Sequence, residues 1–169
     1  MSNFHHKVVS LKLLPDQTFA SMSRALRELP FSSKLFLSIH VPDQQKEIES
    51  LQASRRIAYS MVSGKKGARD IDSEAKLQDL ETLLEDMVTS GEKVFHVSLN
   101  VVLTSTDLSD LDDQVSQTIM RLRDLSGAEG MEETVACFEV FKELSIPNAR
   151  GTIRKKRLKT SNLADFIPI

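Results

Sequence analysis

The chain has 169 residues, of which 40% are hydrophobic and 27% are charged. That is enough apolar material for a folded core and too much for a disordered chain. No apolar run approaches the roughly 18 residues of a membrane span, and the N-terminal region lacks the pattern of a signal peptide. The single Cys137 excludes an internal disulfide and a cysteine-based zinc cage, and it fits a reducing compartment.

Charge is distributed unevenly along the chain. The formal net charge is −2, but residues 150–169, the basic tail, carry +5, so the first 149 residues carry −7. An acidic body argues against a general nucleic-acid-binding surface. The tail fits either an exposed linker or a contact with lipid phosphate, nucleic acid or an acidic neighbouring domain. Its candidate partner-contact residues are Arg150, Arg154, Lys155, Lys156, Arg157 and Lys159.

The first third of the chain predicts a strand, a helix and a strand. Apolar residues alternate over 6–14, where Pro15 ends the pattern, and again over 34–41. Between them, apolar residues recur at helical spacing over 17–29, and Pro30 stops that helix.

A long helical hairpin is predicted next. Residues 43–63 have a thin helical pattern that Asp43 is placed to cap, and residues 72–90 form a second helix that Gly91 ends. Two such helices joined by a short glycine-bearing loop form an antiparallel hairpin. The expected seam of the second helix consists of Leu77, Leu80, Leu84, Met87 and Val88.

Residues 93–104 show the clearest strand, with His96, Ser98 and Asn100 on its polar side. A helix follows over 107–125, capped by Thr106 or Asp107, with an apolar stripe. Residues 131–146 fit either a last strand or a helix, and periodicity does not decide between them. The expected stripe of the 107–125 helix is Leu108, Leu111, Val115, Ile119 and Leu122.

Without the insertion at about 43–91, this order is β-α-β-β-α-β, the ferredoxin-like split motif. We therefore expect an α+β, ferredoxin-like two-layer sandwich over residues 1–149, with the helical hairpin inserted between strands two and three. Because the opposite faces of strands 34–41 and 93–104 are polar, we expect that side of the sheet to meet water or a partner.

No catalytic constellation is apparent. The segment Ser63–Gly67 lacks the G-x-x-x-x-G-K-[ST] pattern of a phosphate loop and fits a hairpin tip. The histidines lack metal-ligand spacing, although His40 and His96 are placed to approach each other across the sheet. Cys137 lies in an apolar neighbourhood, where a thiol behaves as a small hydrophobe. We expect no catalytic residue, metal or cofactor in this chain.

The end of the chain carries the most specific pattern. A helix ends in Leu144-Ser145-Ile146-Pro147-Asn148, a basic link follows, and then comes Thr160-Ser161-Asn162-Leu163-Ala164-Asp165-Phe166-Ile167-Pro168. This order resembles the junction before the motor domain in the ATPases of conjugative transfer and type IV secretion, the TraC-like and VirB-type proteins. Their N-terminal domain is also similar in element order, including the long helices between strands two and three.

The resemblance implies that 150–169 is a linker toward an ATPase domain absent from this chain, so that ATP and magnesium belong to that motor domain. It implies a non-catalytic scaffold that contacts other subunits, the secretion apparatus and its own motor, at the inner face of the bacterial membrane. Two alternatives stay open. One is a ferredoxin-like nucleic-acid-binding module that uses the basic tail, and the other is a small enzyme on the same scaffold.

Overall fold

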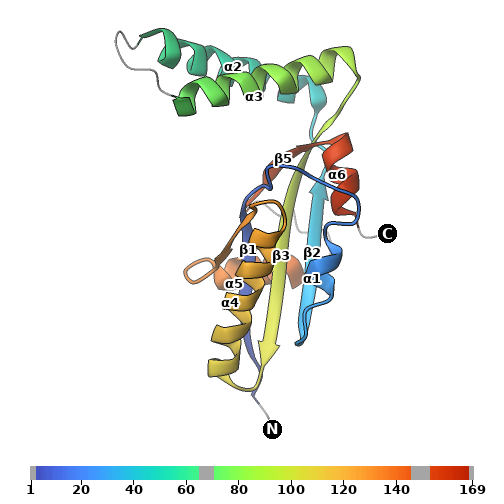
Figure 1. Ribbon diagram of the computed structural model, residues 1–169, viewed down its shortest axis with the longest axis vertical. Coiled ribbons are helices and arrows are strands. Elements are labelled where there is room, and N and C mark those ends of the chain that lie inside the picture. The colour runs from blue at the N-terminus through green and yellow to red at the C-terminus, as the bar shows by residue number, and fades with distance from the viewer. Residues whose placement is uncertain (1–2, 65–70, 146–152, 168–169) are drawn as a thin grey trace. The chain divides into compact units, whose positions relative to one another are not determined.

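The computed structural model describes residues 3–64, 71–145 and 153–167. The chain divides into two compact units. A sheet unit comprises Met1–His40, His96–Leu158 and Asn162–Ile169, and a hairpin unit comprises Val41–Phe95 and Lys159–Ser161. The elements in chain order (Figure 1) are β1 (His5–Leu13), α1 (Arg24–Arg27), β2 (Ser33–His40), α2 (Gln44–Gly64), α3 (Ile71–Thr89), β3 (Val94–Ser105), α4 (Leu108–Asp124), β4 (Glu129–Glu132), α5 (Cys137–Ser145), β5 (Lys156–Lys159) and α6 (Thr160–Phe166).

The protein is α+β, with a five-stranded sheet. Its main path runs β2-β3-β1-β4 with neighbouring strands antiparallel, and β5 also pairs with β3. The pairing places Val8 opposite Val102 and Ser10 opposite Asn100, so these four residues share one face of the sheet.

One face of the sheet carries the apolar residues that the strand pattern predicted. Val97, Leu99, Val101 and Leu103 of β3 are almost completely buried. Helix α4 covers this face, and α1 contacts both α4 and β2. Gly130 of β4 permits a close approach here, because a Cβ at that position would lie 2.4 Å from Cδ1 of Leu122.

The opposite face is covered in part by α5. Val8 and Val102 form a buried cluster with Val140 of α5, and Phe36 and Phe141 pack against it. The expectation that this face meets water or a partner is therefore wrong for the part of the face that α5 covers. The polar residues there are satisfied within the fold, since the buried Ser10 hydroxyl donates to Oδ1 of Asn100 over 2.7 Å.

The hairpin unit has a narrow core. Leu51 of α2 packs with Leu84 and Met87 of α3 and with Val94 at the start of β3. Val88, expected in the seam, is 73% exposed. The side chain of Gln44 replaces a strand partner at Val94: its Nε2 donates to the Val94 carbonyl and its Oε1 accepts from the Val94 N–H, both over 2.9 Å.

The predicted helix ends are confirmed. The Asp43 carboxylate accepts from the backbone N–H of Gln45 over 3.0 Å, and Asp107 accepts from that of Ser109 over 2.8 Å. Gly91 has φ of +67°, the left-handed conformation that ends a helix readily only at glycine.

Three segments differ from the expectation. The helix predicted over 17–29 is reduced to α1, because Ser21 has φ of +60° and interrupts the turn, although Met22 and Leu26 are still buried. Residues 131–146, expected to form either a strand or a helix, contain part of each: β4 ends at Glu132 and α5 begins at Cys137. Leu108, expected in the stripe of α4, is 55% exposed, while the stripe from Leu111 onward is buried.

Candidate interaction site

The segment that carries the basic tail is folded rather than extended. Residues 156–166 form β5 and α6, with Leu158, Leu163 and Phe166 buried. The linker expectation is wrong for this part, because three apolar side chains spaced among charged and polar ones attach the segment to the core. Burial of each apolar side chain of this size contributes about 1.5–3 kcal/mol.

Arg154 is placed against the sheet by the turn that precedes β5. Its Nε donates to Oε1 of Glu133 over 2.7 Å and its Nη2 donates to Oε2 over 3.1 Å. Glu133 is 3% exposed, so this is a two-point ion pair on an almost fully buried carboxylate. The guanidinium of Arg154, with help from the Ser10 hydroxyl, lowers the pKa of Glu133 below its usual value, against the opposing effect of burial.

Lys159 and Thr160 are held by the hairpin unit. Lys159 Nζ lies 2.8 Å from Oδ2 of Asp86 at the end of α3. The Thr160 N–H donates to the Lys93 carbonyl over 3.0 Å, and the Lys93 N–H donates to Oγ1 of Thr160 over 3.1 Å. These bonds continue the strand pairing to the first residue of α6.

The six predicted partner-contact residues therefore have different positions. Arg154 and Lys159 have intramolecular carboxylate partners, so much of their charge is neutralised within the chain. Lys155 and Lys156 are half-buried, and Arg157 is exposed and also has an interaction within the protein. Arg150 lies outside the described residues. The sequence could not reveal these partners, because Glu133 and Asp86 are distant from the tail in sequence.

The hairpin unit contains a hollow that the sequence analysis missed. A groove of about 530 Å³ lies between α2 and α3, and an adjoining hollow of about 420 Å³ is bordered by Arg55, Arg56 and Tyr59. Arg55 Nε lies 2.8 Å from Oε1 of Glu81 across the groove, and Tyr59 is 61% exposed. The helical spacing of 52, 55, 56 and 59 was the available signal. The groove is lined by Gln52, Arg55, Arg56, Glu81, Leu84, Glu85, Val88 and Thr89.

The groove combines charged, polar and apolar side chains. Guanidinium groups bind carboxylates and stack on planar groups, and an exposed tyrosine offers a large apolar surface with a polar tip. The nearby Glu81 and Glu85 would repel phosphates. A partner side chain with both apolar and polar parts suits these residues better than a polyanion.

The residues considered for catalysis lie in β1, β2, β3 and α5. His40 and His96 are directly opposite in β2 and β3, with ring centroids 6.0 Å apart, which confirms their predicted approach. His6 contacts Phe141 and its Nδ1 lies 3.0 Å from Oγ1 of Thr104.

Burial raises the pKa of the Cys137 thiol, which disfavours the reactive thiolate. Among the described residues, no three His, Cys, Asp or Glu side chains are grouped to hold a metal ion.

The phosphate-loop-like segment 63–67 is mostly outside the described residues. Within residues 3–64, 71–145 and 153–167, no helix has both the length and the apolar character needed to span a membrane. Comparison with known proteins found no matching family model and no matching curated protein.

Proposed function

We propose that this chain is a non-catalytic interaction domain of an ATPase of conjugative transfer or type IV secretion. The observation that carries the proposal is the position of the Thr160–Phe166 pattern. Thr160 pairs with Lys93, Asn162 Nδ2 donates to Oγ1 of Thr18 over 2.8 Å, and Leu163 and Phe166 are buried. Four members of the pattern, Thr160, Asn162, Leu163 and Phe166, thus have a packing or hydrogen-bonding role that related domains would share.

A ferredoxin-like arrangement of the sheet unit is part of this proposal. The strand order β4-β1-β3-β2, the helix after β1 and the helix after β3 suit that split motif. Figure 1 shows α4 next to β1 and α1 next to β2, in agreement with their contacts. In this arrangement α2 and α3 form an insertion between strands two and three, and β5 and α6 follow the motif.

The expected partners are proteins. The domain would contact other subunits and the secretion apparatus on the inner face of the bacterial membrane, and would pass through its C-terminal segment to a motor domain that binds ATP and magnesium. The groove beside Arg55, Arg56 and Tyr59 is the surface we assign to such contacts, because it is hollow, mixed in charge and partly apolar.

The proposal is tested by titrating this chain with ATP and magnesium and by determining the sequence encoded after Ile169. We expect no heat of nucleotide binding from this chain and a phosphate loop in the following segment. ATP hydrolysis by this chain, or a following segment without a motor domain, would refute the proposal. Alanine substitutions at Arg56 and Tyr59 should impair conjugative transfer in the parent protein while leaving its ATPase activity intact.

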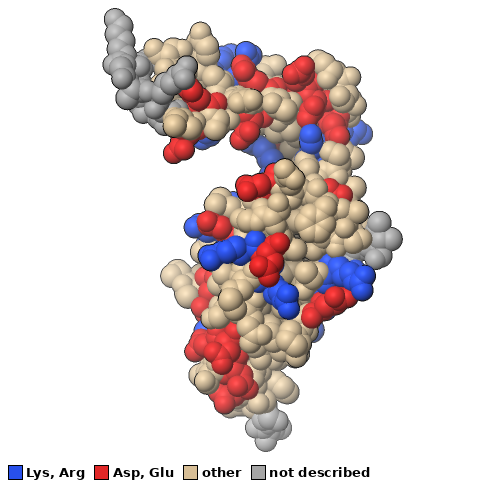
Figure 2. All heavy atoms as spheres, in the orientation of Figure 1, with Lys and Arg blue, Asp and Glu red and all other residues tan. Residues whose placement is uncertain are grey.

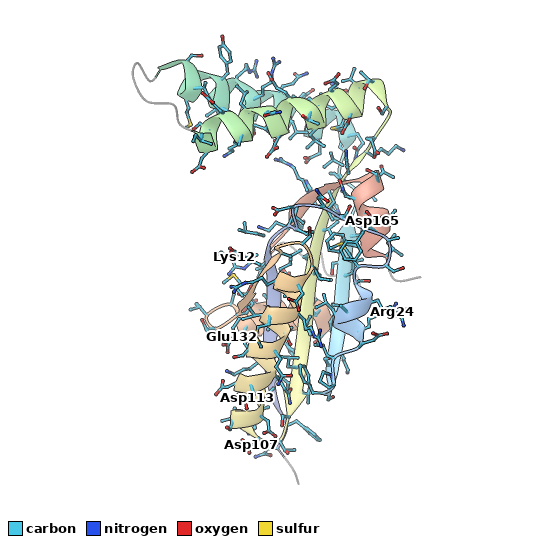
Figure 3. The ribbon with its side chains drawn as sticks, viewed as in Figure 1. Lys12, Arg24, Asp107, Asp113, Glu132 and Asp165 are labelled. Carbon is cyan, nitrogen blue, oxygen red and sulfur yellow. The ribbon has the colours of Figure 1, made fainter. Side chains whose placement is uncertain are left out.

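The nucleic-acid alternative has less support. Phe36, the aromatic residue on the relevant sheet face, packs against the α5 cluster. Figure 2 shows acidic side chains gathered at one end of the sheet unit, and Figure 3 labels Asp107 and Asp113 there, at the start of α4. Salt-dependent binding of short single-stranded DNA that is lost when Lys155, Lys156 and Arg157 are neutralised would instead favour the alternative.

A further inference from the structure

The two edges of the main sheet path are built differently. β4 has four residues, two of them glutamates, and its pairing with β1 shifts register between Leu11 and Leu13. Short length, charge and irregularity are the features that protect an edge from further pairing. β2 at the other edge has eight residues that pair with β3 in unbroken register, with no proline, no acidic residue and one lysine, Lys34. In the described residues, no strand pairs with its outer side.

The hydrogen-bond pattern shows which groups face that outer side. The Thr104 N–H donates to the Ser32 carbonyl over 3.2 Å, so Ser32 belongs to a hydrogen-bonded pair with β3. Because such pairs alternate along an antiparallel ladder, the even-numbered residues of β2 bond to β3. The N–H and C=O groups of Leu35, Leu37 and Ile39 therefore point outward. Helix α1 contacts α4 as well as β2, and in Figure 1 it is drawn beside β2.

The same three residues form an apolar row. Leu35 and Leu37 are half-buried and Ile39 is 44% exposed. Within residues 3–64, 71–145 and 153–167, the row thus offers backbone groups that pair with no strand and partly exposed apolar side chains along one line. A second strand at this edge would form hydrogen bonds with these backbone groups and would cover these apolar side chains.

We propose that the outer edge of β2 pairs with β2 of a second copy of this chain, antiparallel about a two-fold axis at Leu37. In that register Leu37 faces Leu37, Leu35 faces Ile39, Phe36 faces Ser38 and Lys34 faces His40. In this register the Lys34 of one copy faces no lysine or arginine of the other. The three outward residues of each copy would exchange about six main-chain hydrogen bonds across the axis. This inference does not rest on the proposed function.

Self-pairing suits this edge better than pairing with a charged peptide. The strand carries little charge. Antiparallel pairing about Leu37 places each apolar residue of the row opposite another apolar residue, so the strand complements a second copy of itself. A two-fold contact of this kind is closed, because each copy uses its β2 edge, and the remaining edge strands, β4 and β5, have only four residues each. The contact therefore predicts a dimer and no larger polymer.

The first test measures the mass of the chain by sedimentation equilibrium from about 1 µM to about 1 mM, which spans affinities of roughly −8 to −4 kcal/mol. We expect a monomer–dimer equilibrium. Leu37→Lys and Leu37→Glu, each alone, place like charges opposite each other at the axis and should shift the chain to monomer. A mixture of the two variants should restore the dimer. Met120→Lys and Met120→Glu are matched controls at a 57% exposed position of α4 and should dimerise as the parent does.

A second measurement needs no substitution and decides the matter if the Leu37 variants fail to fold. Amide exchange of the parent chain, followed by NMR, should show protection of Leu35, Leu37 and Ile39 that is lost on dilution. The amides of Lys34, Phe36 and Ser38 should stay protected at both concentrations. A monomer throughout the range, a dimer whose outward amides exchange freely, or two monomeric Leu37 variants that do not associate with each other would overturn the proposal.

Discussion

Arg154 holds the carboxylate of Glu133 through two hydrogen bonds of 2.7 and 3.1 Å, although the two residues lie 21 positions apart. Glu133 follows β4, and its backbone N–H donates to the Val8 carbonyl over 2.8 Å. The ion pair thus joins the turn before β5 to the residue that follows β4 and bonds to β1. A residue that the sequence offered as a partner contact is instead used to attach the C-terminal segment.

Removing the guanidinium should destabilise the sheet unit. Arg154→Met leaves the buried Glu133 without its cation, and because Arg154 is itself partly open to water, we expect a loss of about 1–3 kcal/mol. Arg154→Lys keeps the charge but not the two-point geometry and should lose less. Urea unfolding of both variants at pH 7 measures the difference, and equal stabilities of Arg154→Met and the parent would contradict this account.

The same pair predicts a pH dependence. The pKa of Glu133 is lowered in the folded protein by Arg154 and then by the Ser10 hydroxyl. Its contribution to stability is therefore present above the usual glutamate pKa of 4.5 and is lost as the pH falls through the lower, folded value. Glu133→Gln should flatten the stability profile in that acidic range. Unfolding free energies of parent and variant, compared from neutral to acidic pH, test this.

Gln44 should be needed at the base of the hairpin unit. Its side-chain amide makes both hydrogen bonds with the backbone of Val94, a residue with no exposed surface. Gln44→Ala leaves those buried groups unpaired and should cost about 1–3 kcal/mol. Gln45→Ala, an exposed neighbour, is the control and should be nearly neutral. Hydrogen exchange at Val94 reports the local effect, and an unchanged rate in Gln44→Ala would contradict it.

Gly130 should resist substitution for a packing reason. A Cβ there would meet Leu122 at 2.4 Å and Val9 at 3.3 Å, so Gly130→Ala should cost about 1–3 kcal/mol through overpacking. Shortening Leu122 to Ala removes the nearest atom, so the double variant should cost less than the sum of the single ones. At Gly91 a Cβ meets nothing within 4 Å, and the cost of Gly91→Ala should come from its φ of +67° alone. Denaturation of all four variants distinguishes the cases.

The seam of the hairpin should depend on Leu51. This residue of α2 packs against α3 and is only 1% exposed. Leu51→Ala should therefore destabilise the hairpin by about 2–5 kcal/mol. Ile57 on the same helix is 57% exposed and Ile57→Ala should have little effect. Hydrogen exchange followed by mass spectrometry should show faster exchange in α2 and α3 of Leu51→Ala. Equal loss of protection in β1 would show that the two units unfold together.

Local patterns predicted most of the elements. The alternation of 34–41 and 93–104, the caps Asp43 and Asp107 and the stop at Gly91 act through neighbouring residues, so they are legible from sequence. The α1 region was overpredicted because a helical pattern does not reveal that Ser21 adopts a left-handed conformation. β5 was missed because a strand with a single buried apolar residue, Leu158, has no periodicity to detect.

The sequence by itself determined the α+β composition, the hairpin between the second and third strands and the unequal charge of body and tail, since each depends on residue type and spacing alone. Only the tertiary structure decided what the tail's charges do, because Glu133 and Asp86 reach Arg154 and Lys159 through the fold and not through the chain. It also showed that, in the part of the chain that the structure describes, no strand pairs with the outer side of β2, which no local pattern encodes because strand pairing joins residues that are distant in sequence.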